Sequence, residues 1–154
     1  MYSVLLSLHS LFRWFVLASL IFTLYRGYKG WFSNLPFTKF DNTIRQTTAT
    51  ITHVQLILGV TLYFISPIVS YFLHNFSEAV HMREMRFFGM EHITVMLTAI
   101  TVITIGSAKT KQKNTDREKF KAMAIWYSAG LFLVLASIPW GVLFLVSRPY
   151  FRLF

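Results

Sequence analysis

The sequence contains no cysteine and few charged residues, and each shortage removes a class of function. Without cysteine, the chain forms no disulfide, no thiolate metal site, no iron–sulfur cluster and no covalently attached c-type haem. Any metal or cofactor would therefore be held by histidine, methionine, tyrosine or carboxylate side chains. Charged residues make up 14% of the chain, against about 25% in a typical soluble domain, so too few remain to cover a soluble surface.

The apolar residues instead fall in four blocks, each long enough for a membrane-spanning helix. The blocks cover approximately residues 2–25, 47–65, 87–105 and 122–146. We therefore expect an all-α integral membrane protein, a single domain over residues 1–154 that forms an up-down four-helix transmembrane bundle. Residues 68–86 mix aromatic and charged side chains, which predicts a short interfacial segment between the second and third membrane helices.

Local signals mark the ends of the second helix. Thr38 followed by Asp41 resembles an N-cap with an acidic residue in the first turn, so we expect the helix to begin near Lys39. Ser66 and Pro67 mark its end, because the residue before a proline is disfavoured in the helical conformation.

Basic residues concentrate in the first and third loops, which explains the net charge of +9 by membrane topology. The positive-inside rule places these two loops in the cytoplasm, and hence both termini outside. No basic stripe with interleaved aromatics is present, so we expect the lipid bilayer as a partner and no nucleic acid. The basic residues of the two loops are Arg26, Lys29, Lys39, Arg45, Lys109, Lys111, Lys113, Arg117, Lys119 and Lys121.

Polar side chains inside membrane helices are costly and usually face the bundle interior. His9 and Arg13 are four residues apart and share one face of the first helix. His9 lies roughly 10 Å below the outer end of its helix, and His92 on the third helix lies at a similar depth. Because the first and third helices are diagonal in an up-down bundle, these two imidazoles are positioned to ligate one haem iron, with Arg13 pairing with a propionate.

His53 lies deeper, nearer the middle or the cytoplasmic half of the second helix. It is a third ligand candidate, a proton carrier or a quinone contact, and a shift of one helical turn would make His53 and His92 the alternative ligand pair. Helical periodicity puts Thr52, Gln55 and Gly59 on roughly the opposite face from His53. Each histidine also has a simpler interpretation, a hydrogen bond across a helix interface without any cofactor.

Three motifs stand out, H-S-x-x-R-W in the first helix, H-x-Q-x-x-x-G in the second and R-F-F-x-x-E-H at the start of the third. They resemble a family of small bacterial membrane proteins known as cytochrome B or cytochrome b-like. The resemblance covers nearly the whole chain. It implies b-type haem, electron transfer and a location in the bacterial cytoplasmic membrane, with His9, His53 and His92 as possible ligands and Arg13 in support.

The leading hypothesis is therefore a small haem b-binding electron-transfer protein or subunit with two histidine ligands, and not an enzyme on its own. A quinone or a membrane redox partner would exchange electrons with it, and it would work as part of a larger complex. The alternative is a cofactor-free membrane subunit that stabilises or assembles such a complex. A transporter is the least favoured reading, since no repeat or broken helix is visible.

Overall fold

The computed structural model describes residues 1–139, and this part of the chain is helical with no strand. Four of its helices are long and apolar enough to cross a membrane, which confirms the all-α prediction and is compatible with a multi-pass membrane protein. The long helices are α1 (Tyr2–Phe32), α2 (Lys39–Ile65), α6 (His92–Lys111) and α7 (Asp116–Ser137). The third candidate span begins before α6 and covers Arg83–Lys111. Shorter helices join α2 to α6, namely α3 (Pro67–His74), α4 (Phe76–Ala79), α5 (Arg83–Arg86) and the π-helix η1 (Phe87–Glu91).

The predicted boundaries of α2 are confirmed by its caps. The Thr38 hydroxyl accepts a hydrogen bond from the Asp41 backbone N–H at 3.4 Å, and the Asp41 carboxylate accepts from the Thr38 N–H at 3.0 Å. At the other end, α2 stops at Ile65, and the Ser66 side chain caps α3 with Pro67 in its first turn.

The predicted end of the fourth membrane helix is wrong. We expected the helix to continue to residue 146, but α7 ends at Ser137 and Ile138 is extended. Pro139 explains this end, because a proline disfavours the helical conformation of the residue before it. Residues 140–146 and the C-terminus lie outside the described part of the chain.

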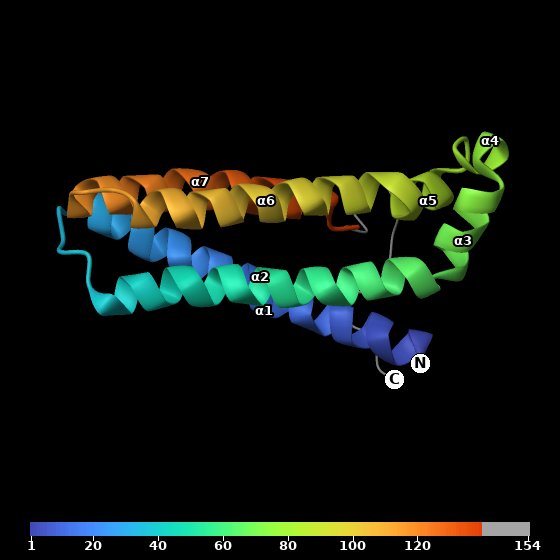
Figure 1. The fold of residues 1–154 in the computed structure, drawn as a ribbon, viewed down its shortest axis with the longest axis horizontal. Helices are drawn as coiled ribbons and strands as arrows, with labels where there is room; N and C mark the ends of the chain where they lie inside the picture. The colour runs from blue at the N-terminus through green and yellow to red at the C-terminus, as the bar shows by residue number, and fades with distance from the viewer. Residues whose placement is uncertain (140–154) are drawn as a thin grey trace.

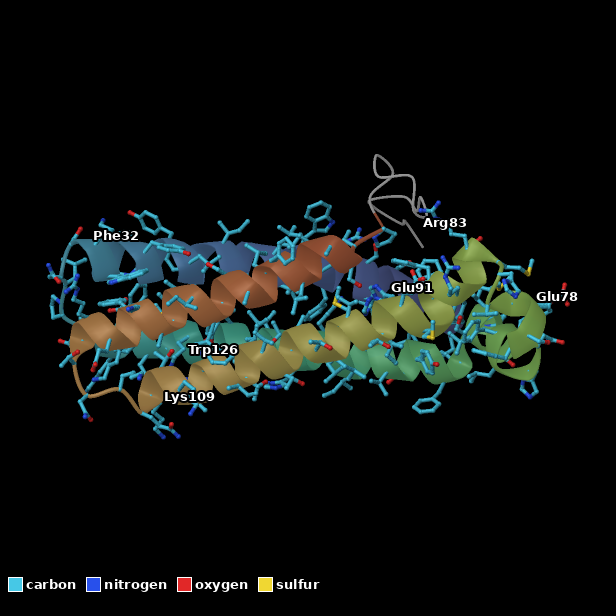
Figure 2. All side chains as sticks on the ribbon, turned by 90° about the horizontal axis from the view of Figure 1, so that it is seen from above. Phe32, Glu78, Arg83, Glu91, Lys109 and Trp126 are labelled. Carbon is cyan, nitrogen blue, oxygen red and sulfur yellow. The ribbon has the colours of Figure 1, made fainter. Side chains whose placement is uncertain are left out.

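The four long helices form an elongated bundle (Figure 1). α1 packs against α2 and α7, and α6 packs against the same two helices, so α1 and α6 lie diagonally across the bundle. The α1–α2 and α6–α7 connections lie at one end, which we name the loop end. The short helices α3 to α5 lie at the other end, near the N-terminus, which we name the π-helix end (Figure 1). Figure 2 places Lys109 toward the loop end and Glu78 and Arg83 at the π-helix end.

A polar network links all four long helices near the loop end. The Asp41 carboxylate on α2 is fully buried and lies 2.6 Å from an Arg26 guanidinium nitrogen on α1. Arg45, also buried, donates to the backbone carbonyl of Ser107 on α6 at 2.8 Å. The Tyr127 hydroxyl on α7 donates to the Arg45 carbonyl at 2.8 Å. We refer to these five residues as the loop-end clamp.

Candidate functional site

A cavity of about 180 Å³ lies between the four long helices toward the π-helix end, where α3 and η1 also line it. Most of its wall is apolar, as is usual for sites that bind apolar cofactors or ligands. The longer polar side chains that reach it from α1, α2 and α6 include His9, Arg13, Gln55, Tyr63 and His92. The cavity is therefore an apolar space with a small number of converging polar groups.

His9 and His92 meet in this cavity from the two diagonal helices. Their ring centroids are 6.4 Å apart, and the ring planes are inclined by 75°. The matched depth expected from the sequence is thus found in the structure.

The hydrogen bonds of His92 determine which of its nitrogens carries the proton. Its Nδ1 lies 2.9 Å from the carbonyl oxygen of Ser137 on α7. A carbonyl oxygen only accepts, so Nδ1 is the donor, and in a neutral ring Nε2 keeps the lone pair. An Nδ1–H bonded to a backbone carbonyl is also the usual arrangement of a metal-binding histidine.

Gln55 on α2 is the side chain that faces the ring of His9. Its amide nitrogen donates to the His9 backbone carbonyl at 2.9 Å and lies 3.4 Å from His9 Nε2. A donor facing Nε2 favours the lone pair on that atom. Within residues 1–139, His9 Nδ1 and Gln55 Oε1 are buried and have no hydrogen-bond partner. Buried polar atoms are seldom left unsatisfied, and a water molecule or a polar group of a ligand in the cavity would satisfy these two atoms.

Small and aromatic residues of α2 shape the wall beside His9. A Cβ atom on Gly59 would lie 3.2 Å from Cε1 of His9, so the imidazole packs directly against the α2 backbone. Thr52, Gln55, Gly59 and Tyr63 all line the cavity, which confirms the face expected for the first three. The Tyr63 hydroxyl donates to the Gly89 carbonyl at 2.8 Å, inside the π-helix that directly precedes His92.

Arg13 lines the same cavity one helical turn from His9. Its Nη2 donates to the Ser10 hydroxyl at 3.3 Å, and its guanidinium carbon lies 5.4 Å from the Trp14 ring centroid. The cation therefore lies on the cavity wall and contacts two groups of its own helix. Of the four candidate site residues, the structure brings together His9, Arg13 and His92.

His53 is the candidate that does not join this cluster. Its Nε2 lies 3.0 Å from the Thr104 hydroxyl on the exposed side of α2 and α6, where it lines a separate hollow. The alternative pairing of His53 with His92 therefore has no support from the arrangement of these side chains.

Three features of the site were not predicted from the sequence, namely the π-helix, the Tyr63 contact and the Ser137 contact. Tyr63 follows Gly59 by four residues and so lies on the same face, which was a usable signal. Nothing in the local sequence marked Ser137 as a partner of His92.

Comparisons with family models, curated proteins and solved structures find no match for this chain. Among residues 1–139, no three histidine, aspartate or glutamate side chains gather in a group that could hold a metal ion.

Proposed function

We propose that this protein is a small haem b-binding membrane electron-transfer protein or subunit, with His9 and His92 as the two axial ligands. The supporting observation is the 6.4 Å between the two ring centroids inside an apolar cavity. Two imidazole nitrogens that each bind one metal at about 2 Å place their ring centroids roughly 6 Å apart. The spacing of the two rings fits that geometry.

The protonation states favoured by the surroundings also fit this role. The Ser137 carbonyl favours a lone pair on Nε2 of His92. The Gln55 amide faces the lone pair on Nε2 of His9 at 3.4 Å and would have to move aside for a metal to bind there. Arg13 on the wall of the same cavity would pair with a carboxylate of the bound group. The apolar wall would keep water from the cavity. A bound haem b would supply the one-electron redox chemistry.

A visible spectrum tests the proposal directly. The protein would be produced in haem-sufficient cells, purified in detergent and measured as a reduced-minus-oxidised difference. We expect the sharp absorption bands of low-spin, six-coordinate haem b. A protein that carries no haem under these conditions would contradict the proposal, and a cofactor-free subunit would then be the better account.

We further propose that the bundle is an up-down arrangement in a bacterial cytoplasmic membrane, with α3 to α5 as the interfacial segment and the N-terminus outside. The support is the excess of basic residues in the two connections at the loop end. A topology reporter fused after Lys113 should behave as cytoplasmic, and one fused near Ser77 as external. The reverse pattern would contradict this orientation. The proposed external C-terminus lies outside the described residues.

In this account, the electrons come from or go to a quinone or a membrane redox partner, within a larger complex. With haem held by His9 and His92, the chain would carry electrons and would not catalyse a reaction of its own.

A further inference from the structure

A second hollow, of about 230 Å³, opens on the outer surface of α2 and α6. His53, Thr101 and Thr104 line it and are exposed, beside the partly exposed Leu97 and Ile105. His53 lies near the middle of α2, so in a membrane this surface faces the hydrocarbon layer. An ionisable side chain at that depth is costly without a polar partner and is by default a functional-site candidate.

The hydrogen bonds around His53 determine what such a partner must offer. The Thr104 hydroxyl donates its one proton to the Ile100 carbonyl at 2.7 Å. It therefore accepts from His53 Nε2, 3.0 Å away, and Nε2 must carry a proton. In the neutral ring, Nδ1 then holds a lone pair and is an acceptor. A ligand of His53 must thus bring a hydrogen-bond donor.

The hollow also lies close to the cavity of His9 and His92. Leu56 and Ile100 line both spaces, so a single layer of side chains separates them. A molecule in the hollow would be a near neighbour of the proposed redox site while staying accessible from the lipid.

We infer that this hollow binds a lipid-soluble aromatic alcohol of the hydroquinone class, whose hydroxyl donates a hydrogen bond to Nδ1 of His53. The mid-membrane depth favours an apolar molecule over a lipid headgroup, and the nitrogen lone pair requires a donor. The choice of a redox-active alcohol rests on the proposed function, whereas binding itself does not require haem.

The test is equilibrium binding to the full chain in phosphatidylcholine nanodiscs, measured by calorimetry without oxygen. The probes are a decyl-substituted benzohydroquinone, its dimethyl ether, which lacks the donors, and decanol, which has a hydroxyl but no aromatic ring. The wild-type protein should bind the hydroquinone roughly three- to ten-fold more tightly than the ether, the contribution of one hydrogen bond. Equal affinities for the hydroquinone and the ether would overturn the inference, and decanol binding as tightly as the hydroquinone would overturn the aromatic class.

Variants separate the role of His53 from general effects on the surface. His53→Leu should abolish the preference for the hydroquinone. Thr104→Val should reduce it, because His53 is then free to present either nitrogen. Thr98→Val is the matched control, since Thr98 is also exposed on α6 and its hydroxyl bonds to its own helix at 2.9 Å. The control should keep the wild-type preference, and its loss there would contradict a specific role for His53.

Haem content, recorded on the same samples, distinguishes the two proposals. A preference for the hydroquinone in protein without haem would leave this inference standing and remove the proposed electron transfer. Haem-loaded protein without the preference would overturn this inference and leave the proposed electron transfer standing.

Discussion

The two ends of the bundle differ in how their buried polar groups are bonded. At the loop end, Asp41, Arg45 and Tyr127 hold α1, α2, α6 and α7 together through direct ion pairs and hydrogen bonds, and only Nε of Arg45 lacks a partner among the described residues. Toward the π-helix end, His9 Nδ1 and Gln55 Oε1 are buried without partners among the described residues, beside a cavity. The loop-end clamp thus has a structural role, whereas the cavity toward the π-helix end has the features of a binding site.

This difference indicates a division of labour along the helices. A clamp at one end provides stability that lets the other end keep unsatisfied polar atoms and empty space, both of which cost free energy in a folded protein. Changes at the loop end should therefore reduce stability, whereas changes around the cavity should affect ligand binding with little effect on stability.

The largest effect on stability should come from Asp41→Ala. The carboxylate is fully buried and its partner Arg26 has a side chain only 21% exposed, so the change breaks a buried ion pair and a capping box together. We expect a loss of about 3 kcal/mol in the free energy of unfolding, measured by denaturant titration in detergent micelles. Asp116→Ala is the control, because this exposed residue forms only a long contact with Lys119, worth about 0.5 kcal/mol at most. Equal losses of unfolding free energy in the two variants would contradict a stabilising role for the loop-end clamp.

A pair of glycine substitutions compares the two ends with the same chemical change. A Cβ on Gly27 would lie 3.3 Å from the backbone of Ala124, whereas one on Gly59 would lie 3.2 Å from the tip of the His9 ring. A helix backbone moves less easily than an imidazole. Gly27→Ala should therefore lose about 1 kcal/mol of stability, and Gly59→Ala should gain up to about 1 kcal/mol from helix propensity.

The same two variants should differ in the opposite sense in haem content. Gly59→Ala shifts the His9 ring and should retain less haem per protein, whereas folded Gly27→Ala should retain the wild-type amount. Thermal unfolding and the haem-to-protein absorbance ratio measure the two effects on one preparation. Reduced stability in Gly59→Ala together with normal haem content would contradict the claim that changes at the cavity affect ligand binding and not stability.

Two tyrosines offer a smaller contrast. Tyr127 and Tyr63 each donate to a backbone carbonyl at 2.8 Å, but Tyr127 is fully buried in the clamp while Tyr63 is partly exposed at the cavity. Tyr127→Phe should lose about 1 kcal/mol of stability, and Tyr63→Phe about half as much. The same denaturant titration measures both values. A larger loss of stability for Tyr63→Phe than for Tyr127→Phe would contradict the stabilising role of the loop end.

The smallest effect on stability is expected for Arg13→Leu. Arg13 is partly buried, and its hydrogen bond to the Ser10 hydroxyl of its own helix is long, at 3.3 Å, so we expect its removal to cost little stability. If the guanidinium pairs with a carboxylate of the bound group, haem content should fall while the free energy of unfolding stays within about 0.5 kcal/mol of the wild type. Unchanged haem content in the purified variant would remove Arg13 from the site.

The part of this account that the sequence predicted depends on regular helix geometry. The rise per residue and the diagonal position of the first and third helices were enough to bring His9 and His92 to one depth, and Thr38 with Asp41 was enough to locate a helix start. The sequence also placed Gln55 and His53 on opposite faces of α2.

The remaining features depend on contacts between distant segments or on irregular backbone. The π-helix before His92 inserts a wider turn that local periodicity does not reveal, and it changes the direction in which later side chains point. The contact of Ser137 with His92 joins residues 45 apart in the chain, so no local pattern contains it. The end of α7 was missed although Pro139 was a readable signal, because the apolar block continues beyond it.

The most direct test of the central claim is the haem spectrum of three alanine variants prepared side by side, His9→Ala, His53→Ala and His92→Ala. The account predicts that His9→Ala and His92→Ala each lose the low-spin spectrum, whereas His53→Ala keeps it, because His53 bonds to Thr104 in a separate hollow. Loss of the spectrum in His53→Ala together with its survival in His9→Ala would contradict the ligand pair.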